Sequence, residues 1–130
     1  MKSLIVLPPV AAILCALTLT PLPAAPANRL ADQGEQAFAT CRACHSLQAG
    51  AKSVMGPNLH GLFGRKAGSV AGFNYSPALK ASNLVWDAKT LDQFLAAPSK
   101  KVPGTRMVIN VTDPAKRAAL IKYLKAETSK

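Results

Sequence analysis

The sequence predicts a small all-α domain of three to five short helices joined by Gly- and Pro-rich loops. Apolar residues recur at helical spacing in several short segments. No run alternates apolar and polar residues over the length that a half-buried strand requires. The 130 residues leave room for one domain.

Residues 1–27 have the order of a secretory signal peptide. Lys2 gives a positive start, residues 4–20 are almost wholly apolar, and a run of small residues ending at Ala27 supplies an A-x-A cleavage site. We expect cleavage after Ala27, which leaves residues 28–130 as the folded domain. The alternative is an uncleaved membrane anchor, because an apolar run of roughly 17 residues is at the short limit for spanning a bilayer.

The expected mature domain is strongly basic and poor in aromatic residues. Loss of Lys2 from 16 Lys and Arg leaves 15 against 6 Asp and Glu, a formal charge of +9. With 5% aromatic residues, so small a domain usually needs a staple such as a disulfide, a metal or a cofactor. A basic domain attracts acidic surfaces. We expect an acidic protein site rather than nucleic acid, because the chain is exported and its basic residues are not interleaved with aromatic residues for base stacking.

The first helix is predicted over residues 32–40. Asp32 and Glu35 have the spacing of a capping box. Gly34 inside this helix costs about 1 kcal/mol relative to Ala, which indicates that another backbone packs closely on it. The stretch 50–74 is rich in loop-forming residues. So long an irregular segment makes sense in a compact domain if it wraps a large ligand.

Three further helices follow the loop, and each begins with a capping side chain. The caps are Ser76, Asp87 and Asp113. Proline occupies the first turn of the first and last of these helices, and Pro98 ends the middle one after residue 97. The last helix carries one apolar stripe at positions i, i+3 and i+4, formed by Leu120, Tyr123 and Leu124.

The segment Cys41-Arg42-Ala43-Cys44-His45 has the pattern of a c-type haem attachment site. Its two thiols, three positions apart, can reach both vinyl groups on one side of the porphyrin, and His45 then points its imidazole at the iron. A thioredoxin-like pair would need a βαβ context, a zinc site needs four ligands, and a disulfide within the motif would close a tiny loop. The sequence therefore predicts one covalent haem c on Cys41 and Cys44.

The sixth iron position decides what such a haem does. Met107 follows a Pro-Gly turn and is far enough along the chain to reach the opposite haem face. His60, Met55 and an open position are the alternatives. A thioether ligand favours Fe(II) and raises the potential. An open position would instead indicate gas binding or peroxidase-like chemistry.

With these residues placed, residues 30–126 resemble the class I cytochromes c, of the mitochondrial cytochrome c and bacterial cytochrome c2 type. Four motifs carry the resemblance: Gly34 with Phe38, residues 41–45, residues 56–66 and residues 103–107. The resemblance implies the cytochrome c fold, with the first and last helices crossing where Gly34 and Phe38 meet Leu120 and Tyr123. It also implies a single-electron carrier in which His45 and Met107 are the axial ligands of the iron.

The resemblance assigns further roles around the haem. The carbonyl of Pro57 would support the His45 ring, and Thr105 would close a loop over one propionate. Three residues would contact the other, buried propionate, which needs a charge-assisted partner: Arg65, Tyr75 and Trp86. Residues expected to ring the haem edge and dock acidic partners are Lys52, Lys66, Lys100, Lys101 and Arg106. Residues expected only to cover the last helix are Lys116, Arg117, Lys122 and Lys125.

The sequence departs from the family at several positions. Phe94 stands where the family usually has a Tyr, and Ile109 replaces the usual aromatic residue two positions after the methionine. Leu79 and Ser99 replace the customary Asn and Lys. These departures indicate a bacterial relative.

These features predict a monomeric electron carrier, not an enzyme, exported to the bacterial periplasm. We expect it to shuttle electrons between membrane redox complexes, namely a quinol–cytochrome c reductase, a terminal oxidase or a reaction centre, in a respiratory or photosynthetic chain. Membrane contact would be peripheral at most, or through an uncleaved leader. The alternatives are a dedicated acceptor of one periplasmic dehydrogenase, and a haem enzyme or sensor with a labile sixth ligand.

Overall fold

The computed structural model describes residues 26–52 and 55–129, in which every named element is helical. The elements are α1 (Pro26–Phe38), the 3-10 turn η1 (Cys41–Ala43), α2 (Pro77–Ala81), α3 (Ala88–Ala96), α4 (Pro98–Lys101) and α5 (Pro114–Glu127). Within the described ranges there is no strand, and the β pairing is one isolated bridge between Lys66 and Val85. The predicted all-α class is confirmed.

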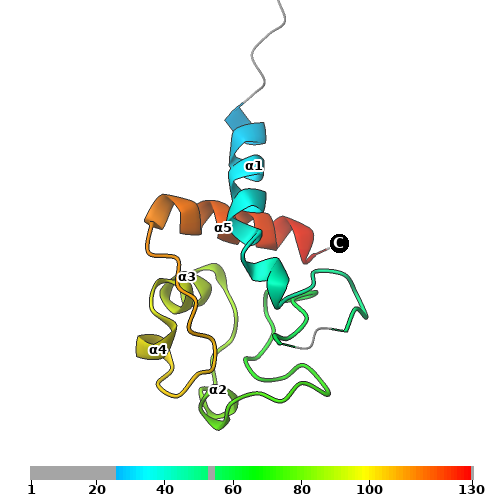
Figure 1. The fold of residues 1–130 in the computed structure, drawn as a ribbon, viewed down its shortest axis with the longest axis vertical. Helices are drawn as coiled ribbons and strands as arrows, with labels where there is room; N and C mark the ends of the chain where they lie inside the picture. The colour runs from blue at the N-terminus through cyan, green and yellow to red at the C-terminus, as the bar shows by residue number, and fades with distance from the viewer. Residues whose placement is uncertain (1–25, 53–54, 130) are drawn as a thin grey trace, which may run out of the picture.

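The two longest helices, α1 and α5, cross above the rest of the molecule (Figure 1). A Cβ atom built on Gly34 would lie 2.5 Å from the Cβ of Tyr123 and 2.6 Å from the carbonyl oxygen of Ala119. Beside this contact, the Phe38 and Tyr123 rings lie 5.8 Å apart, and Leu120 is fully buried. The close backbone approach predicted from Gly34 is therefore confirmed.

Below this crossing, the long loop between η1 and α2 lies on one side, and α3 and α4 lie on the other (Figure 1). The core brings side chains of α1, α3 and α5 together with those of the loop. Its buried members from these helices include Phe38, Leu91, Phe94, Leu120 and Leu124. This arrangement leaves the loop facing α3 across the interior.

The three caps predicted for the helices after the loop are observed. The Ser76 hydroxyl accepts from Leu79 N at 3.2 Å, and the Asp87 carboxylate accepts from Thr90 N at 2.6 Å. The Asp113 carboxylate accepts from two amides at the start of α5, at 2.8 and 3.1 Å. The hydrogen bonds with Thr90 lower the pKa of Asp87, so the Asp87 cap is retained until the pH falls below the ordinary range of an aspartate.

Two helix boundaries differ from the sequence prediction. Helix α1 begins at Pro26, so Asp32 lies inside it and is not the first residue of a capping box. The reason is that the preceding residues include good helix formers and that proline suits the first helical turn. Pro98 ends α3 as predicted, but it also opens α4, in which two amides donate to the carbonyl of Ala97.

The predicted signal peptide lies almost entirely outside the described residues, which begin at Pro26. Among the described residues, no helix has both the length and the apolar character that a membrane crossing requires.

Candidate functional site

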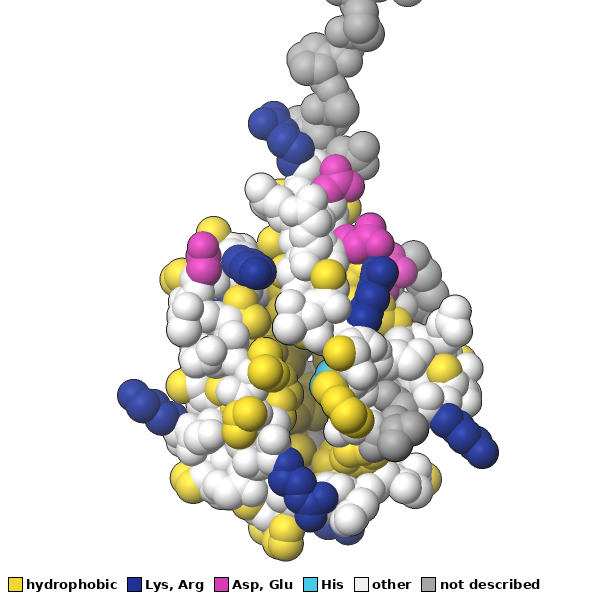
Figure 2. All heavy atoms as spheres, in the orientation of Figure 1, with side chains coloured by type: hydrophobic (Ala, Val, Ile, Leu, Met, Phe, Trp, Pro, Cys, Tyr) yellow, Lys and Arg dark blue, Asp and Glu magenta, His cyan; other side chains and the backbone are white. Residues whose placement is uncertain are grey.

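A cavity of about 730 Å³ opens into the interior between the loop, α3, α5 and the segment after α4. Figure 2 shows hydrophobic side chains gathered around this hollow. Ten of the residues predicted to bind the haem or to dock partners line it: Cys41, Cys44, His45, Pro57, Arg65, Tyr75, Trp86, Thr105, Arg106 and Met107. One cavity thus collects residues that are spread over 67 positions of the chain.

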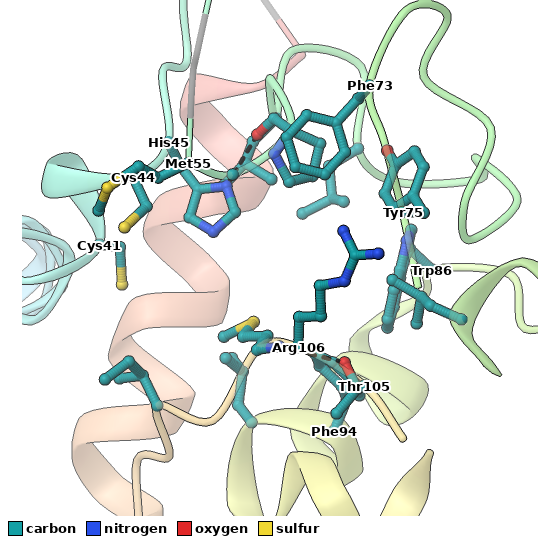
Figure 3. A pocket seen from close by; sticks show the side chains of 18 of the residues that line it. Cys41, Cys44, His45, Met55, Phe73, Tyr75, Trp86, Phe94, Thr105 and Arg106 are labelled. Carbon is teal, nitrogen blue, oxygen red and sulfur yellow. Dashed lines mark hydrogen bonds between the residues drawn. The ribbon is translucent and has the colours of Figure 1, made fainter. Parts of the chain in front are cut away.

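The attachment motif forms one wall of the cavity. The turn η1 follows α1 directly, and the amides of Cys44 and His45 both donate to the carbonyl of Cys41, at 3.0 and 2.9 Å. This tight turn places the two cysteines and the histidine side by side, with the imidazole directed into the cavity (Figure 3). Burial raises the pKa of Cys41, so its sulfur is a neutral thiol at neutral pH. In the described ranges no group of three His, Cys, Asp or Glu side chains could hold a metal ion.

The imidazole of His45 is held in one orientation. Its Nδ1 lies 2.8 Å from the carbonyl oxygen of Pro57, and because a carbonyl can only accept, Nδ1 carries the proton. Nε2 is then the basic nitrogen, as iron ligation requires. Gly56 permits this contact, because a Cβ there would lie 2.6 Å from Cε1 of the ring. Burial lowers the pKa of His45, which favours the neutral, ligating form.

The loop that carries Pro57 is fixed by Asn58, a residue of the 56–66 motif to which the sequence analysis gave no role of its own. The Asn58 amide donates to the carbonyls of Gln48 and Ala51, at 2.7 and 2.8 Å. Its oxygen accepts from His60 N at 2.7 Å. An Asn after Gly-Pro is a typical turn residue, but the sequence gives no sign of which carbonyls it meets.

Polar groups gather at one end of the otherwise apolar cavity. The guanidinium of Arg65 donates to the carbonyls of His60 and Asn58, at 2.7 and 2.9 Å. The Tyr75 hydroxyl accepts weakly from Val70 N at 3.4 Å, which leaves its proton to donate elsewhere. Burial lowers the pKa of Arg65 and raises that of Tyr75.

Trp86 lies beside Tyr75 at this end of the cavity (Figure 3). Its ring packs edge-on against Phe94 at 5.1 Å. Its indole N–H donates to none of the side chains or carbonyls that the structure describes. A cation and two donors in one apolar cavity suit a buried carboxylate, such as a haem propionate.

The candidates for the sixth ligand are placed differently. His60 is not among the residues that line the cavity. Met55 lines it but adjoins Gly56, which packs on the His45 ring, and its side chain is 69% exposed. Met107 lines the cavity, is half-buried and follows Thr105, which lies across the cavity from His45 (Figure 3).

Of the predicted docking residues, only Arg106 lines the cavity. Lys52, Lys66 and Lys100 are exposed and do not line the cavity. Lys101 donates to the side chain of Gln93 at 2.6 Å. Arg106 lines the cavity and donates to the carbonyl of Asn74 at 2.9 Å, so it reaches across toward Phe73 and Tyr75 (Figure 3).

The cavity fits a haem: it is mostly apolar, it has two thiols and an imidazole on one wall, and it has donors for a carboxylate at one end. No protein-family model matches the chain. The sequence is 48% identical over 107 residues to a cytochrome c of Nigella damascena, covering 81% of this chain and 96% of that one. The chain belongs to the cytochrome c family.

A bacterial relative and a solved structure agree with this membership. The chain is 44% identical over 103 residues to a cytochrome c2 of Rhodoblastus acidophilus, covering 76% of this chain and 96% of that one. The fold is similar to that of cytochrome cH from Methylobacterium extorquens, with a TM-score of 0.68 and 49% identity over 74% of this chain and 97% of that chain. As a cytochrome c, the protein binds haem c covalently, with Cys41 and Cys44 as its attachment motif, and it is a haem electron carrier.

Proposed function

We propose that this cytochrome c carries single electrons between membrane redox complexes, with His45 and Met107 as the axial ligands of its iron. The observation that carries the proposal is the lining of one cavity by both side chains, His45 beside the attachment cysteines and Met107 next to the turn that faces it. Two protein ligands leave no iron position for a substrate. The bound haem supplies a one-electron change between Fe(III) and Fe(II).

The side chains of the cavity serve this change by holding the haem still. The Pro57 carbonyl fixes the His45 ring, and Met107 N donates to the Thr105 hydroxyl at 3.3 Å, which supports the turn that carries the thioether. We propose that Arg65, Tyr75 and Trp86 neutralise and hold one propionate. Thr105 is our candidate for the other.

The opening of the cavity offers an apolar contact surface for a redox partner. Three of the large hydrophobic side chains that are most exposed also line the cavity: Met55 at 69%, Val108 at 70% and Ile109 at 53%. None of the lining residues is acidic. We propose that acidic docking sites on a quinol–cytochrome c reductase, a terminal oxidase or a reaction centre meet this surface, steered by the exposed lysines around it.

Electron transfer to such a partner should slow as salt is added. With a quinol–cytochrome c reductase as the donor, we expect the second-order rate constant to fall by about tenfold or more between low and high ionic strength, because salt screens the steering charges. Stopped-flow mixing measures this rate. Lys100→Gln should lower the low-salt rate, whereas Lys122→Gln on α5 serves as a matched control. A flat salt response would remove the steering role.

We also propose that the domain is exported to the bacterial periplasm and that residues 1–27 are removed. The expected cut after Ala27 falls within the first turn of α1, which begins at Pro26. The intact mass of the protein from periplasmic extract should equal residues 28–130 plus one haem. A mass that retains the leader, with the protein in the membrane fraction, would support an uncleaved anchor instead.

A further inference from the structure

Arg117 on α5 is buried, although the sequence predicted that it only covers the helix. The residue is 9% exposed. Its Nε lies 2.6 Å from the carboxylate of Asp92 on α3. Its Nη1 donates to the carbonyls of Val111 and Thr112, at 2.8 and 3.2 Å. One guanidinium therefore joins two helices to the end of the segment that carries Met107.

The same end of this segment is held by α3. The amide of Val111 donates to the carbonyl of Leu95 at 2.8 Å, so Val111 is bonded to α3 through its N–H and to α5 through its carbonyl. Residues 108–110 are exposed and form no hydrogen bond with any residue that the structure describes. Val111 is therefore the first fixed point after Met107.

On the N-terminal side of Met107, the two preceding residues are both held by hydrogen bonds. Thr105 N donates to the carbonyl of Val102 at 3.0 Å, and Arg106 bonds to Asn74. Met107 thus lies between hydrogen-bonded residues directly before it and a span of three residues, 108–110, after it. Any displacement of Met107 from the iron has to be absorbed by that span and by its anchor at Val111.

We propose that the Asp92–Arg117 pair is a positioning device that keeps Met107 on the haem iron and resists its replacement by outside ligands. This inference rests on the proposed function, because it needs Met107 as the sixth ligand. The carboxylate engages Nε and so orients the planar guanidinium, which leaves Nη1 aimed at two carbonyls. Lysine, a flexible point charge, would not hold both carbonyls in a fixed direction.

Imidazole binding to the oxidised holoprotein tests the proposal, because imidazole must displace the sixth ligand. Two variants weaken the Asp92–Arg117 pair in different ways. Asp92→Asn removes the negative charge that orients the guanidinium. Arg117→Lys keeps the positive charge but removes the planar set of N–H groups that bonds both carbonyls. We expect each to raise the imidazole affinity by a few-fold to about tenfold, the range of a modest coupling energy. Absorption spectra follow the titration, and urea unfolding of each variant reports global stability.

Two control variants separate positioning from general loosening. Glu35→Gln removes the exposed Arg42–Glu35 ion pair, whose atoms lie 2.8 Å apart and which involves neither α3 nor α5. Gly34→Ala disturbs the α1–α5 crossing without touching the Met107 segment. Both controls should leave the imidazole affinity unchanged, and Gly34→Ala should do so although it lowers global stability.

The outcomes distinguish failure of the positioning role from failure of the proposed axial ligation by Met107. Higher imidazole affinity in Asp92→Asn and Arg117→Lys, but not in the controls, supports the positioning role. Lower global stability with unchanged imidazole affinity would mean that the pair is structural only and would overturn it. If the wild-type spectra show no thioether ligand, the proposed axial ligation fails and the inference falls with it. Asp92→Asn keeps the test decisive if Arg117→Lys does not fold.

Discussion

Replacing Met107 by Ala is expected to open the sixth iron position and to lower the reduction potential of the haem. A thioether stabilises Fe(II) relative to Fe(III). Neither of the other two candidate ligands is placed to substitute for it: His60 is outside the cavity lining, and Met55 adjoins the segment that packs on His45. We expect a fall on the order of 0.1–0.3 V, a fraction of the about 0.8 V range that axial ligands span.

Carbon monoxide reports the same change by an independent route. The reduced wild-type protein should not bind carbon monoxide at neutral pH, whereas reduced Met107→Ala should bind it readily. Met55→Ala is the matched control, because it removes a thioether that lines the same cavity, and its spectrum and potential should be those of the wild type. If Met107→Ala has the absorption spectrum and the reduction potential of the wild type, Met107 is not the ligand. Carbon monoxide binding by the wild type would instead favour a haem enzyme or sensor.

The sequence predicts the fold well where one local signal decides the structure. Ser76, Asp87 and Asp113 each begin a helix because a side-chain acceptor satisfies amides within the next three residues. The start of α1 is harder to predict, because Asp32 and Glu35 match a capping box while the residues before them are equally able to continue the helix. A cap pattern therefore does not exclude a helix that began earlier.

The residues of the candidate site likewise fall into those that a local sequence pattern predicts and those that it does not. Cys41, Cys44 and His45 are adjacent in the sequence, so their spacing alone predicts a shared wall of the cavity. The bonds of Asn58 and Arg117 go to backbone carbonyls, which every residue carries. Such bonds leave no pattern of residue types, and for this reason a basic side chain on α5 was expected at the surface although it is buried.

The surface residues show a related limit. Composition predicts a basic domain, but it does not predict which charges are committed to internal bonds. Arg106 and Lys101 each have a partner in the structure, Asn74 and Gln93 respectively. In the proposed docking, steering by charge would therefore rest mainly on exposed lysines outside the cavity lining, and apolar side chains would make the contact at the opening of the cavity.

Replacing Gly34 by Ala is expected to lower the free energy of unfolding by about 2 kcal/mol. Two effects oppose each other: Ala gains about 1 kcal/mol of helix propensity over Gly, and overpacking in a tight contact costs typically 1–3 kcal/mol, occasionally more. Here the cost of overpacking should exceed the gain in helix propensity. The new Cβ would lie 2.5 Å from Tyr123 Cβ and 2.6 Å from the Ala119 carbonyl oxygen, and neither atom is the free end of a flexible side chain. The two longest helices would therefore have to move apart.

Thermal unfolding of the holoprotein measures this loss, which should appear as a fall in Tm of about 10 °C for a domain of this size. Gln36→Ala is the matched control, because Gln36 is exposed on the same helix and its replacement changes propensity without a clash. A higher Tm for Gly34→Ala would show that the crossing has room for a methyl group and that propensity dominates. Since Gly34 contacts α5 at Ala119 and Tyr123 but does not line the cavity, the haem spectrum of the folded variant should not change. Loss of stability without a change in ligation would then separate the part of the fold that holds the domain together from the part that holds the iron.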